Sequence, residues 1–418
     1  MKKISIITLG CKVNQVESEQ VAELLEQDGY DVSMGLNPAD IYIINTCAVT
    51  NEAERKSRNM MAKVLKLNPH AQIYICGCSS QNNAEQFNKG EYVKGIIGNI
   101  DKKQLVSMIE KNDTEFISNV KCVFETRVTP RTRAVLWVQN GCNNFCTYCL
   151  IPYLRGREVS FPLAEVEKEV RKLEKYANEI VVTGINLSSY GNDIEGSDGL
   201  IEIARLFKNS PSRFRFSSLE VNVIDEKFLS ELSTFHNFCD HFHLSLQSGS
   251  NNTLKSMNRH YTKEEYLEKV NLIRKYFPNA GITTDIIIGF PTETNDDFFE
   301  SLEFAKQANF SEMHIFPYSK RNGTVAEKFK NVATDVSERV ARMTRVAEEM
   351  KNAFLVQNKG KTHEVIIENE KNGYYLAHTK NFILCYIESQ TKLKPNQVIK
   401  VKIGKPYEDG VLAKVAKM

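Results

Sequence analysis

The stretch "AVLWVQNGCNNFCTYC", residues 134 to 149, joins a short apolar run to a loop that contains three cysteines. The run is rich in β-branched and aromatic residues, which favour a strand, and the glycine and asparagines that follow favour a tight turn. Cys142, Cys146 and Cys149 therefore lie in the loop after a predicted strand, with Tyr148 between the last two. Thiols at this spacing are typical ligands of zinc or of an iron–sulfur cluster.

The chain has 418 residues, of which 42% are hydrophobic and 25% charged, as expected of a globular protein with several domains. Its first residues, "MKKISIITLG", are too short an apolar run for a secretion signal, and no cleavage site follows. No stretch approaches the roughly 18 apolar residues of a membrane span. We therefore expect a cytoplasmic protein without membrane association, in which the ten cysteines stay reduced. The net charge of +2 does not by itself indicate a nucleic-acid partner.

Six strand candidates follow one another from residue 134 onward, most of them separated by helical patterns. They are "AVLWVQ", "EIVVTG", "RFRFSS", "HFHLSLQ", "ITTDIIIGF" and "EMHIFPY". Six such units in about 190 residues are too few for an eight-stranded (β/α) barrel. The pattern predicts a partial (β/α)6 barrel, with the three-cysteine loop at the face where barrel sites gather.

The first hundred residues predict a doubly wound parallel sheet, because short apolar runs alternate there with amphipathic helical patterns. Cys11, Cys47 and Cys78 each lie at the carboxyl end of one of these strands, where open α/β sheets bind ligands. We therefore expect the three thiols to converge in space. The alternative is that they are small buried residues at strand ends, as Cys76, on the opposite face from Cys78, is expected to be.

The sequence pattern changes after a long charged helical segment at residues 335–360. Short β-branched segments separated by turn residues predict a small antiparallel barrel in the last part of the chain. Residues 360–418 contain ten lysines against six acidic residues, and a basic small barrel is typical of RNA binding. A dimerisation or lid module is the alternative. The lysines expected around exposed strand positions are Lys392, Lys394, Lys400, Lys402 and Lys405, and the candidate stacking residues are Tyr374, Tyr375, Phe382 and Tyr386.

The loop cysteines lack the second ligand pair that a structural zinc site requires. Three thiolates on a four-iron cluster leave one iron open for a small chelating ligand. The cysteine spacing and the partial barrel resemble the radical S-adenosylmethionine superfamily. Over the whole chain the sequence resembles that superfamily's methylthiotransferases, through "LGCKVNQVESE", "INTCAVT", "PYLRGRE", "VVTGINLSSYG", "LSLQSGS", "TDIIIGFP" and "FPYSKRNGT".

The resemblance implies four segments: an N-terminal methylthiotransferase domain (1–112), a linker (113–127), a radical S-adenosylmethionine core (128–357) and an RNA-binding TRAM domain (358–418). It implies two 4Fe–4S clusters, one on Cys142, Cys146 and Cys149 and an auxiliary one on Cys11, Cys47 and Cys78. S-adenosylmethionine bound to the first cluster would give a 5′-deoxyadenosyl radical, and the auxiliary cluster would supply sulfur. The implied partners are the anticodon stem-loop of a tRNA and an electron donor such as flavodoxin or ferredoxin, for a monomeric enzyme.

The family has three substrate branches, and "GCKVNQ", "GCNNFC" and "FPYSKRNGT" most resemble the one that acts on N6-threonylcarbamoyladenosine at tRNA position 37. The others act on N6-isopentenyladenosine in tRNA and on an aspartate of a ribosomal protein. The alternative outside enzymes is an RNA-binding protein whose cysteines hold zinc.

Further residues are candidates by their place after predicted strands or in loops. Residues expected to contact the cofactor are Tyr148, Thr183, Gly184, Asn186, Ser218, Glu220 and Gln247; an ordinary turn or a helix cap is the alternative for most of them. Residues expected to contact tRNA phosphates or a threonyl carboxylate are Arg155, Arg157, Arg259, Lys320 and Arg321, with solvated surface charge as the alternative. We expect no metal ligand among the eight histidines, since none has ligand spacing or an obvious partner in the sequence.

Overall fold

The computed structural model describes residues 2–88, 90–99, 102–111 and 132–416. Their packing divides the chain into two compact units. The first comprises Met1–Thr129, Asn140–Val159 and Ser319–Glu327, and the second comprises Pro130–Gln139, Ser160–Tyr318 and Lys328–Met418. The predicted linker, residues 113–127, lies outside the described residues.

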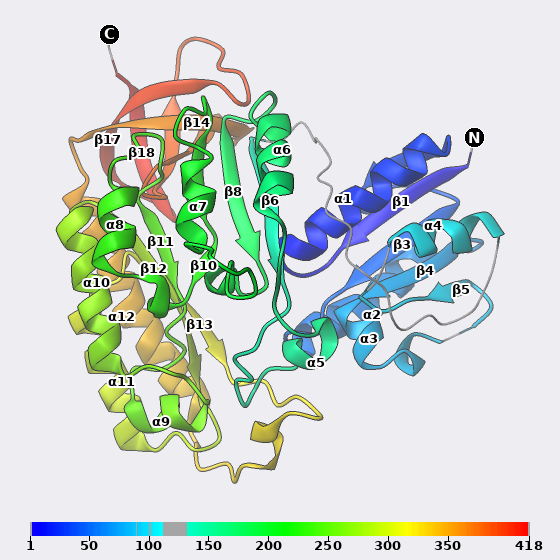
Figure 1. The fold of residues 1–418 in the computed structure, drawn as a ribbon, viewed down its shortest axis with the longest axis horizontal. Helices are drawn as coiled ribbons and strands as arrows, with labels where there is room; N and C mark the ends of the chain where they lie inside the picture. The colour runs from blue at the N-terminus through cyan, green and yellow to red at the C-terminus, as the bar shows by residue number, and fades with distance from the viewer. Residues whose placement is uncertain (1, 89, 100–101, 112–131, 417–418) are drawn as a thin grey trace. The chain divides into compact units, whose positions relative to one another are not determined.

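The first unit is built on a five-stranded parallel sheet, as its sequence pattern predicts (Figure 1). The strand order is β2-β1-β3-β4-β5, with β1 and β3 in register from Ile4 opposite Ile41 to Thr8 opposite Asn45. The strands are β1 (Lys3–Thr8), β2 (Asp31–Met34), β3 (Ile41–Thr46), β4 (Gln72–Gly77) and β5 (Val93–Ile96). The helices are α1 (Lys12–Gln27), α2 (Asn51–Leu67), α3 (Cys78–Asn82), the 3-10 turn η1 (Glu85–Phe87), α4 (Lys102–Lys111) and α5 (Ile151–Arg155).

Alternate residues of each central strand face opposite layers of this sheet, which is why the strands are apolar throughout. On β4, Tyr74 and Cys76 pack with residues of α1 and α4, whereas Ile73 and Ile75 pack with residues of α2. The unit is therefore doubly wound. Cys76 is 2% exposed in one of these cores, as its strand position predicts.

The second unit contains all six strands predicted for a partial barrel, together with two short strands. They form the sheets β7-β6-β8-β9 and β10-β11-β12-β13, in which β6, β8 and β9 pair in parallel, as do β10 to β13. The strands are β6 (Arg133–Asn140), β7 (Val159–Ser160), β8 (Glu179–Gly184), β9 (Arg213–Phe216), β10 (Ser218–Leu219), β11 (His241–Leu244), β12 (Gly281–Ile288) and β13 (Glu312–Pro317).

Helices pack against one face of these sheets and leave the other face for polar side chains. Phe242 of β11, for example, contacts Phe277 at the end of α10 with ring centroids 5.3 Å apart, so its neighbour His243 points to the opposite face. The helices are α6 (Leu163–Leu173), α7 (Leu200–Arg205), α8 (Glu226–Leu232), α9 (Asn251–Ser256), α10 (Lys263–Tyr276), α11 (Asn295–Ala308) and α12 (Val336–Gln357), with the 3-10 turns η2 (Leu187–Ser189) and η3 (Val221–Val223). A further 3-10 turn, η4 (Val325–Lys328), lies mostly in the first unit.

The last part of the chain is a closed five-stranded barrel in the order β14-β15-β16-β18-β17. Its strands are β14 (Thr362–Lys371), β15 (Tyr374–Thr379), β16 (Leu384–Glu388), β17 (Val398–Tyr407) and β18 (Gly410–Val415). We expect an antiparallel barrel from the sequence, and four of its strand pairings are antiparallel. The pairing of β16 with β18 is parallel, because a connection through β17 brings the chain back in the same direction.

This closed barrel packs on the amino ends of the parallel strands, which leaves their carboxyl ends for a site. Glu179, at the start of β8, is fully buried. Its carboxylate forms ion pairs with the guanidinium groups of Arg133 at 3.0 Å and of Arg213 and Arg215 at 2.6 Å each. Arg133 also pairs with Glu368 of β14 at 2.6 Å. A buried charge network thus joins the closed barrel to the α/β part of the same unit.

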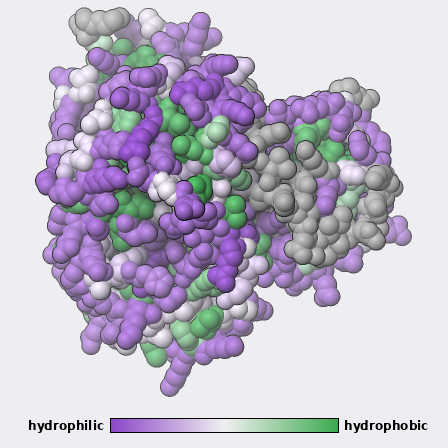
Figure 2. All heavy atoms as spheres, viewed as in Figure 1, coloured by the Kyte–Doolittle hydropathy of each residue, from purple (hydrophilic) through white to green (hydrophobic). Residues whose placement is uncertain are grey.

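Hydrophilic residues cover most of the molecular face drawn in Figure 2, with hydrophobic residues in scattered patches. Among the described residues, no helix is both long enough and apolar enough to cross a membrane.

Candidate functional site

Three cysteines of the first unit follow neighbouring strands of its parallel sheet. Cys11 precedes α1 after β1, Cys47 follows β3 directly, and Cys78 begins α3 after β4. Because β1, β3 and β4 are adjacent in the sheet, all three thiols lie at its carboxyl edge, as predicted.

The thiols of this edge affect one another's pKa values. Burial raises the pKa of Cys47 to about 11; a backbone hydrogen bond involving Val49 opposes this, and Cys78 and Cys11 raise the pKa further. Burial of its thiol likewise raises the pKa of Cys11, although the residue as a whole is exposed. All three are free thiols, so the donor set fits a four-iron cluster held by three protein ligands.

A network of amide side chains fixes the edge that carries these thiols. Asn14 Nδ2 donates to Asn45 Oδ1 at 2.9 Å, and Asn45 Nδ2 donates to the Asn14 carbonyl at 2.9 Å. Gly77 has a φ of 103°, and a Cβ on it would lie 2.5 Å from Asn45 Oδ1. The turn before Cys78 therefore requires glycine at that position.

Arg155 is buried next to these thiols rather than displayed for a substrate. Its guanidinium is 1% exposed and binds both carboxylate oxygens of Glu17, at 3.0 and 3.2 Å, while Nη2 also reaches Asn14 at 3.3 Å. Burial alone would lower the pKa of Arg155, but Cys78, Glu17 and Cys11 outweigh it and raise the pKa. The arginine thus places a fixed positive charge beside the auxiliary cysteines. Its partner Glu17 was not among the residues singled out from the sequence, where the acidic stretch "ESE" on α1 was the available signal.

The second predicted set, Cys142, Cys146 and Cys149, lies in the loop after β6 and is partly exposed. Asn144 N–H donates to Cys142 Sγ at 3.5 Å and Ile151 N–H to Cys149 Sγ at 3.4 Å, while Cys149 N–H bonds the Cys146 carbonyl at 2.9 Å. Amides aimed at sulfur stabilise thiolates, so this donor set also fits a cluster with one open iron.

Gly141 sets the course of this loop. Its φ is 71°, and a Cβ would lie 1.8 Å from the carbonyl oxygen of Arg157, inside any permitted contact. The backbone of residues 140–142 therefore lies directly against the chain after α5, where Cys142 N–H bonds the Gly156 carbonyl at 3.2 Å. Tyr148 is partly exposed in the same loop.

The remaining cationic candidates of the first unit have different surroundings. Arg157 is exposed, with its guanidinium 4.5 Å from the centre of the Phe145 ring, and Lys320 is 62% exposed. Arg321 is 4% exposed and binds Asn51 at 2.7 Å and Glu54 at 2.5 Å. Arg157 and Lys320 are therefore available to a substrate, whereas Arg321 ties its own loop to α2.

In the second unit, the segment after β8 folds around Gln139. Asn186 N–H donates to Gln139 Oε1 at 2.8 Å, and Gly184 lies so close that a Cβ would meet this oxygen at 2.8 Å. Thr183 is 3% exposed at the end of the strand. These three predicted residues thus form one compact turn at the carboxyl end of β8.

Residues at the carboxyl ends of β10 and β11 form a second group. Glu220 pairs with the Arg259 guanidinium, which also lies 5.0 Å from the centre of the Tyr261 ring. Gln247 has a φ of 71°. Its N–H donates to the Asp285 carbonyl at 2.9 Å, and its carbonyl accepts from the Ile287 N–H at 2.9 Å. Arg259 is 4% exposed, so it orients Glu220 instead of projecting into solvent. Ser218 is exposed on β10.

The basic residues of the closed barrel face outward, as expected. All five predicted lysines are exposed: Lys392, Lys394, Lys400, Lys402 and Lys405. Along β17 they alternate with core residues, with Val401 fully buried and Ile403 2% exposed. Of the aromatic candidates, Tyr374 and Tyr386 cluster with Tyr407, Tyr375 packs against the barrel core, and Phe382 stacks on His241 at 4.5 Å.

The strand register brings together two histidines and an aspartate that show no ligand spacing in the sequence. His243, Asp285 and His314 bring their ligand atoms within 4.8 Å of one another. The sequence signal was their place on three successive predicted strands, which only the strand register turns into proximity.

Comparisons with known proteins agree with this architecture. The model of the Radical SAM superfamily matches residues 138–305, and the model described as "Uncharacterized protein family UPF0004" matches residues 3–98. A solved structure, "Structure of Cobalamin-dependent S-adenosylmethionine radical enzyme OxsB with aqua-cobalamin bound", shares the fold with a TM-score of 0.53 and 12% identity. The alignment covers 84% of this chain and 56% of that chain, so this chain spans little more than half of it.

Two curated relatives align over nearly the whole chain. "Threonylcarbamoyladenosine tRNA methylthiotransferase MtaB" of Bacillus subtilis (strain 168) is 33% identical, over 99% of this chain and 97% of the relative. "tRNA-2-methylthio-N(6)-dimethylallyladenosine synthase" of Desulforamulus reducens (strain ATCC BAA-1160 / DSM 100696 / MI-1) is 32% identical, over 96% and 92%. Fold and cysteine loop together define a radical S-adenosylmethionine protein, which implies that cofactor and a 4Fe–4S cluster. The chain belongs to the methylthiotransferase family of this superfamily.

Proposed function

We propose that the chain methylthiolates C2 of N6-threonylcarbamoyladenosine at position 37 of tRNA, giving 2-methylthio-N6-threonylcarbamoyladenosine. The observation that carries the proposal is the presence of two separate three-cysteine sets, one in the loop after β6 and one at the edge of the parallel sheet. A reaction that both activates a C–H bond and inserts sulfur needs two such sites. The relative from Bacillus subtilis, which is named for this substrate, supports the choice of branch.

We assign one 4Fe–4S cluster to Cys142, Cys146 and Cys149 and an auxiliary one to Cys11, Cys47 and Cys78. When bound, the first cluster and S-adenosylmethionine supply the radical chemistry and the second supplies sulfur. The protein holds the thiols in place: Gly141 and the amides of Asn144 and Ile151 at the first set, and Asn45, Gly77 and Arg155 at the second.

We propose seven residues as cofactor contacts, on the strength of the motifs in which they lie. The candidates are Thr183, Gly184, Asn186, Ser218, Glu220 and Gln247, with Tyr148 in the cysteine loop. Arg157 and Lys320 are the exposed cations that we propose as contacts to tRNA phosphates. Arg155, Arg259 and Arg321 each hold a carboxylate of the protein, so we propose that they position the site rather than bind substrate.

We propose that the closed barrel is the TRAM domain and binds the anticodon stem-loop through its outward lysines. Single-stranded and looped RNA is held by basic surfaces and by stacking, and Tyr374 and Tyr386 lie together on one side of this barrel. We further propose the segment boundaries 1–112, 113–127, 128–357 and 358–418, a monomeric enzyme and an electron donor of the flavodoxin or ferredoxin type.

The test is an anaerobic reaction of the reconstituted protein with S-adenosylmethionine and two tRNAs, one carrying threonylcarbamoyladenosine and one carrying isopentenyladenosine. Nucleoside mass spectrometry should find the methylthio product only from the first tRNA. Product from the second alone would place the chain in the branch of the Desulforamulus relative. A colourless protein that binds zinc and does not cleave S-adenosylmethionine would favour the zinc-holding RNA-binding alternative.

The division of labour between the two cysteine sets has its own control. Replacing Cys11, Cys47 and Cys78 by Ala should leave the formation of 5′-deoxyadenosine intact and abolish sulfur insertion. Cys76→Ala is the matched control, because Cys76 lies in the core two residues before Cys78. Equal loss of sulfur insertion in that control would show that the effect comes from folding.

A further inference from the structure

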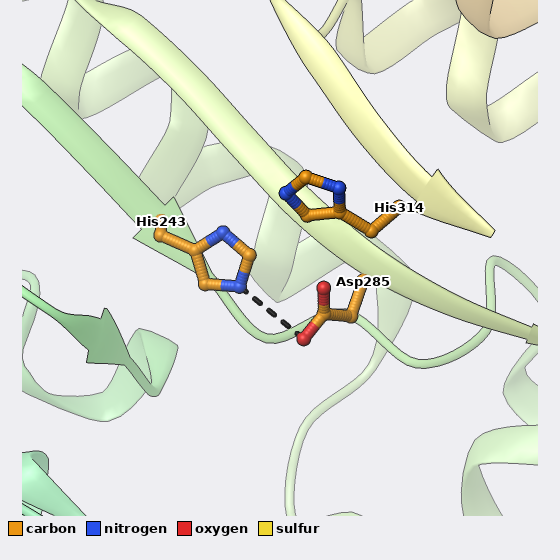
Figure 3. A group of neighbouring side chains, drawn as sticks. All are labelled: His243, Asp285 and His314. Atoms are coloured by element: carbon orange, nitrogen blue, oxygen red, sulfur yellow. Dashed lines mark ion pairs between the residues drawn. The ribbon is translucent and has the colours of Figure 1, made fainter. Parts of the chain in front are cut away.

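His243, Asp285 and His314 lie on three adjacent parallel strands, β11, β12 and β13, and their side chains gather on the face opposite the helices (Figure 3). Asp285 and His314 are direct register partners across β12 and β13. His243 is the register partner of Thr283, two residues before Asp285, so the three residues form one diagonal row. The strand register alone therefore fixes two imidazoles and one carboxylate side by side.

The spacing of their ligand atoms fits a small cation. His243 Nε2 lies 3.3 Å from Asp285 Oδ2, longer than the roughly 2.7–2.9 Å of a charge-assisted hydrogen bond. Two ligands of a tetrahedral ion with bonds of about 2.0–2.1 Å lie about 3.3–3.5 Å apart. The ligand atom of His314 lies within 4.8 Å of the other two, and the residue is exposed.

A buried hydroxyl orients the His243 ring from behind. Thr283 Oγ1 lies 2.9 Å from His243 Nδ1 and 3.1 Å from His241 Nε2. A hydroxyl has one proton, so it can donate to His241 while it accepts the Nδ1–H of His243. In that arrangement His243 presents an unprotonated Nε2 toward Asp285. Metal-binding histidines are held in this way by a partner on the second ring nitrogen.

We propose that His243, Asp285 and His314 bind one divalent first-row transition cation of the zinc type, with water in its remaining positions. Two imidazoles and one carboxylate form a nitrogen and oxygen ligand set, distinct from the six cysteine thiols of the two iron–sulfur sites. The proposal does not depend on the substrate or on the cluster chemistry proposed above. The alternative for the same residues is a hydrogen-bonded network without a metal.

The test uses the holoenzyme, reconstituted anaerobically so that iron and sulfide occupy the cysteines, and then passed over a chelating resin. Calorimetric titration with Zn²⁺ should show one site per chain. Zinc-edge X-ray absorption should give only nitrogen and oxygen neighbours at about 2.0–2.2 Å, without the roughly 2.3 Å sulfur shell of a cysteine site. Absence of a stoichiometric site, or a sulfur shell, would overturn the proposal without touching the proposed reaction.

Variants then locate the site. Asp285→Asn and His314→Ala should weaken zinc binding by at least about 100-fold, since the loss of a second-shell partner alone costs about 10–100-fold. Thr283→Val, which keeps the shape but removes the hydroxyl, should weaken binding by about 10–100-fold. His70→Ala, which removes an exposed histidine in a turn of the first unit, should leave it unchanged. Circular dichroism checks folding, and unchanged zinc affinity in folded Asp285→Asn would refute the assignment.

Discussion

Replacing Arg155 by methionine is expected to destabilise the first unit by about 3 kcal/mol. The side chains of Arg155 and Glu17 are 1% and 5% exposed, and their two contacts measure 3.0 and 3.2 Å. Removing one member of a buried ion pair typically costs about 3–5 kcal/mol, because the other charge stays buried without its partner. The lower end applies here because methionine keeps most of the volume of the side chain.

Hydrogen exchange read by mass spectrometry measures this change where it should occur. A loss of 3 kcal/mol increases the population of the open state by about 150-fold, so the amides of β3 and β4 should exchange correspondingly faster. Trp137, the single tryptophan, lies in the second unit and is 2% exposed. The urea midpoint read from its fluorescence should differ little between Arg155→Met and the unsubstituted protein. The Trp137 signal is therefore an internal control.

A double variant decides whether the buried charge is the cause. Replacing both Arg155 and Glu17 by methionine removes the unpaired charge, and apolar replacements of buried pairs are often neutral or stabilising. The double variant should therefore exchange more slowly than Arg155→Met alone. If Arg155→Met costs less than about 1 kcal/mol, or if the two substitutions simply add, Glu17 is not held as a buried charge by Arg155.

Three further predictions concern charge and backbone. Burial alone would raise the pKa of Glu179, but Arg215, Arg213 and Arg133 outweigh it and hold the pKa well below its usual range. The stability that this carboxylate contributes is present above its unfolded pKa of about 4.3 and is lost as pH falls toward the lower folded value. Glu179→Gln should therefore make the stability read from Trp137 fluorescence fall less steeply with decreasing pH. An unchanged slope would contradict this. Gly141→Ala should reduce iron from about eight to about four per chain, because the added Cβ meets the Arg157 carbonyl. The control is Gly156→Ala, where φ is 79° but nothing lies within 4 Å of an added Cβ. This variant should keep its iron and lose about 1 kcal/mol of unfolding free energy. Equal iron in both would refute the steric argument. Lys400→Glu with Lys402→Glu should weaken tRNA binding and reduce its salt dependence by about 0.7–0.9 per lost phosphate contact, measured by filter binding at several salt concentrations. The charge-matched pair Lys168→Glu with Lys208→Glu, exposed elsewhere in the second unit, should have little effect, and equal losses would exclude a specific basic face.

The sequence by itself determined the local structure around both cysteine sets. Apolar runs that end in cysteine predict β1, β3 and β4 and their shared carboxyl edge, because parallel strands buried on both faces must be apolar throughout. The spacing of Cys142, Cys146 and Cys149 likewise needs no tertiary information, since all three belong to one loop. The six strands of the second unit follow from the same local patterns. The short edge strand β2 escaped prediction because few apolar residues mark it, and β15, which pairs with β14 and β16, escaped prediction as well.

Tertiary structure decided which charged residues are free to meet a substrate. Arg155 and Arg157 belong to one motif, yet Arg155 is buried against Glu17 of α1, 138 residues earlier, and Arg157 is exposed. Tertiary structure also decided that His243, Asp285 and His314 are neighbours. They lie far apart in the chain and meet only through the register of three strands. The alternation of side chains in a short stretch predicts a strand. It does not predict which residues are neighbours across strands, because these depend on register and on long-range packing.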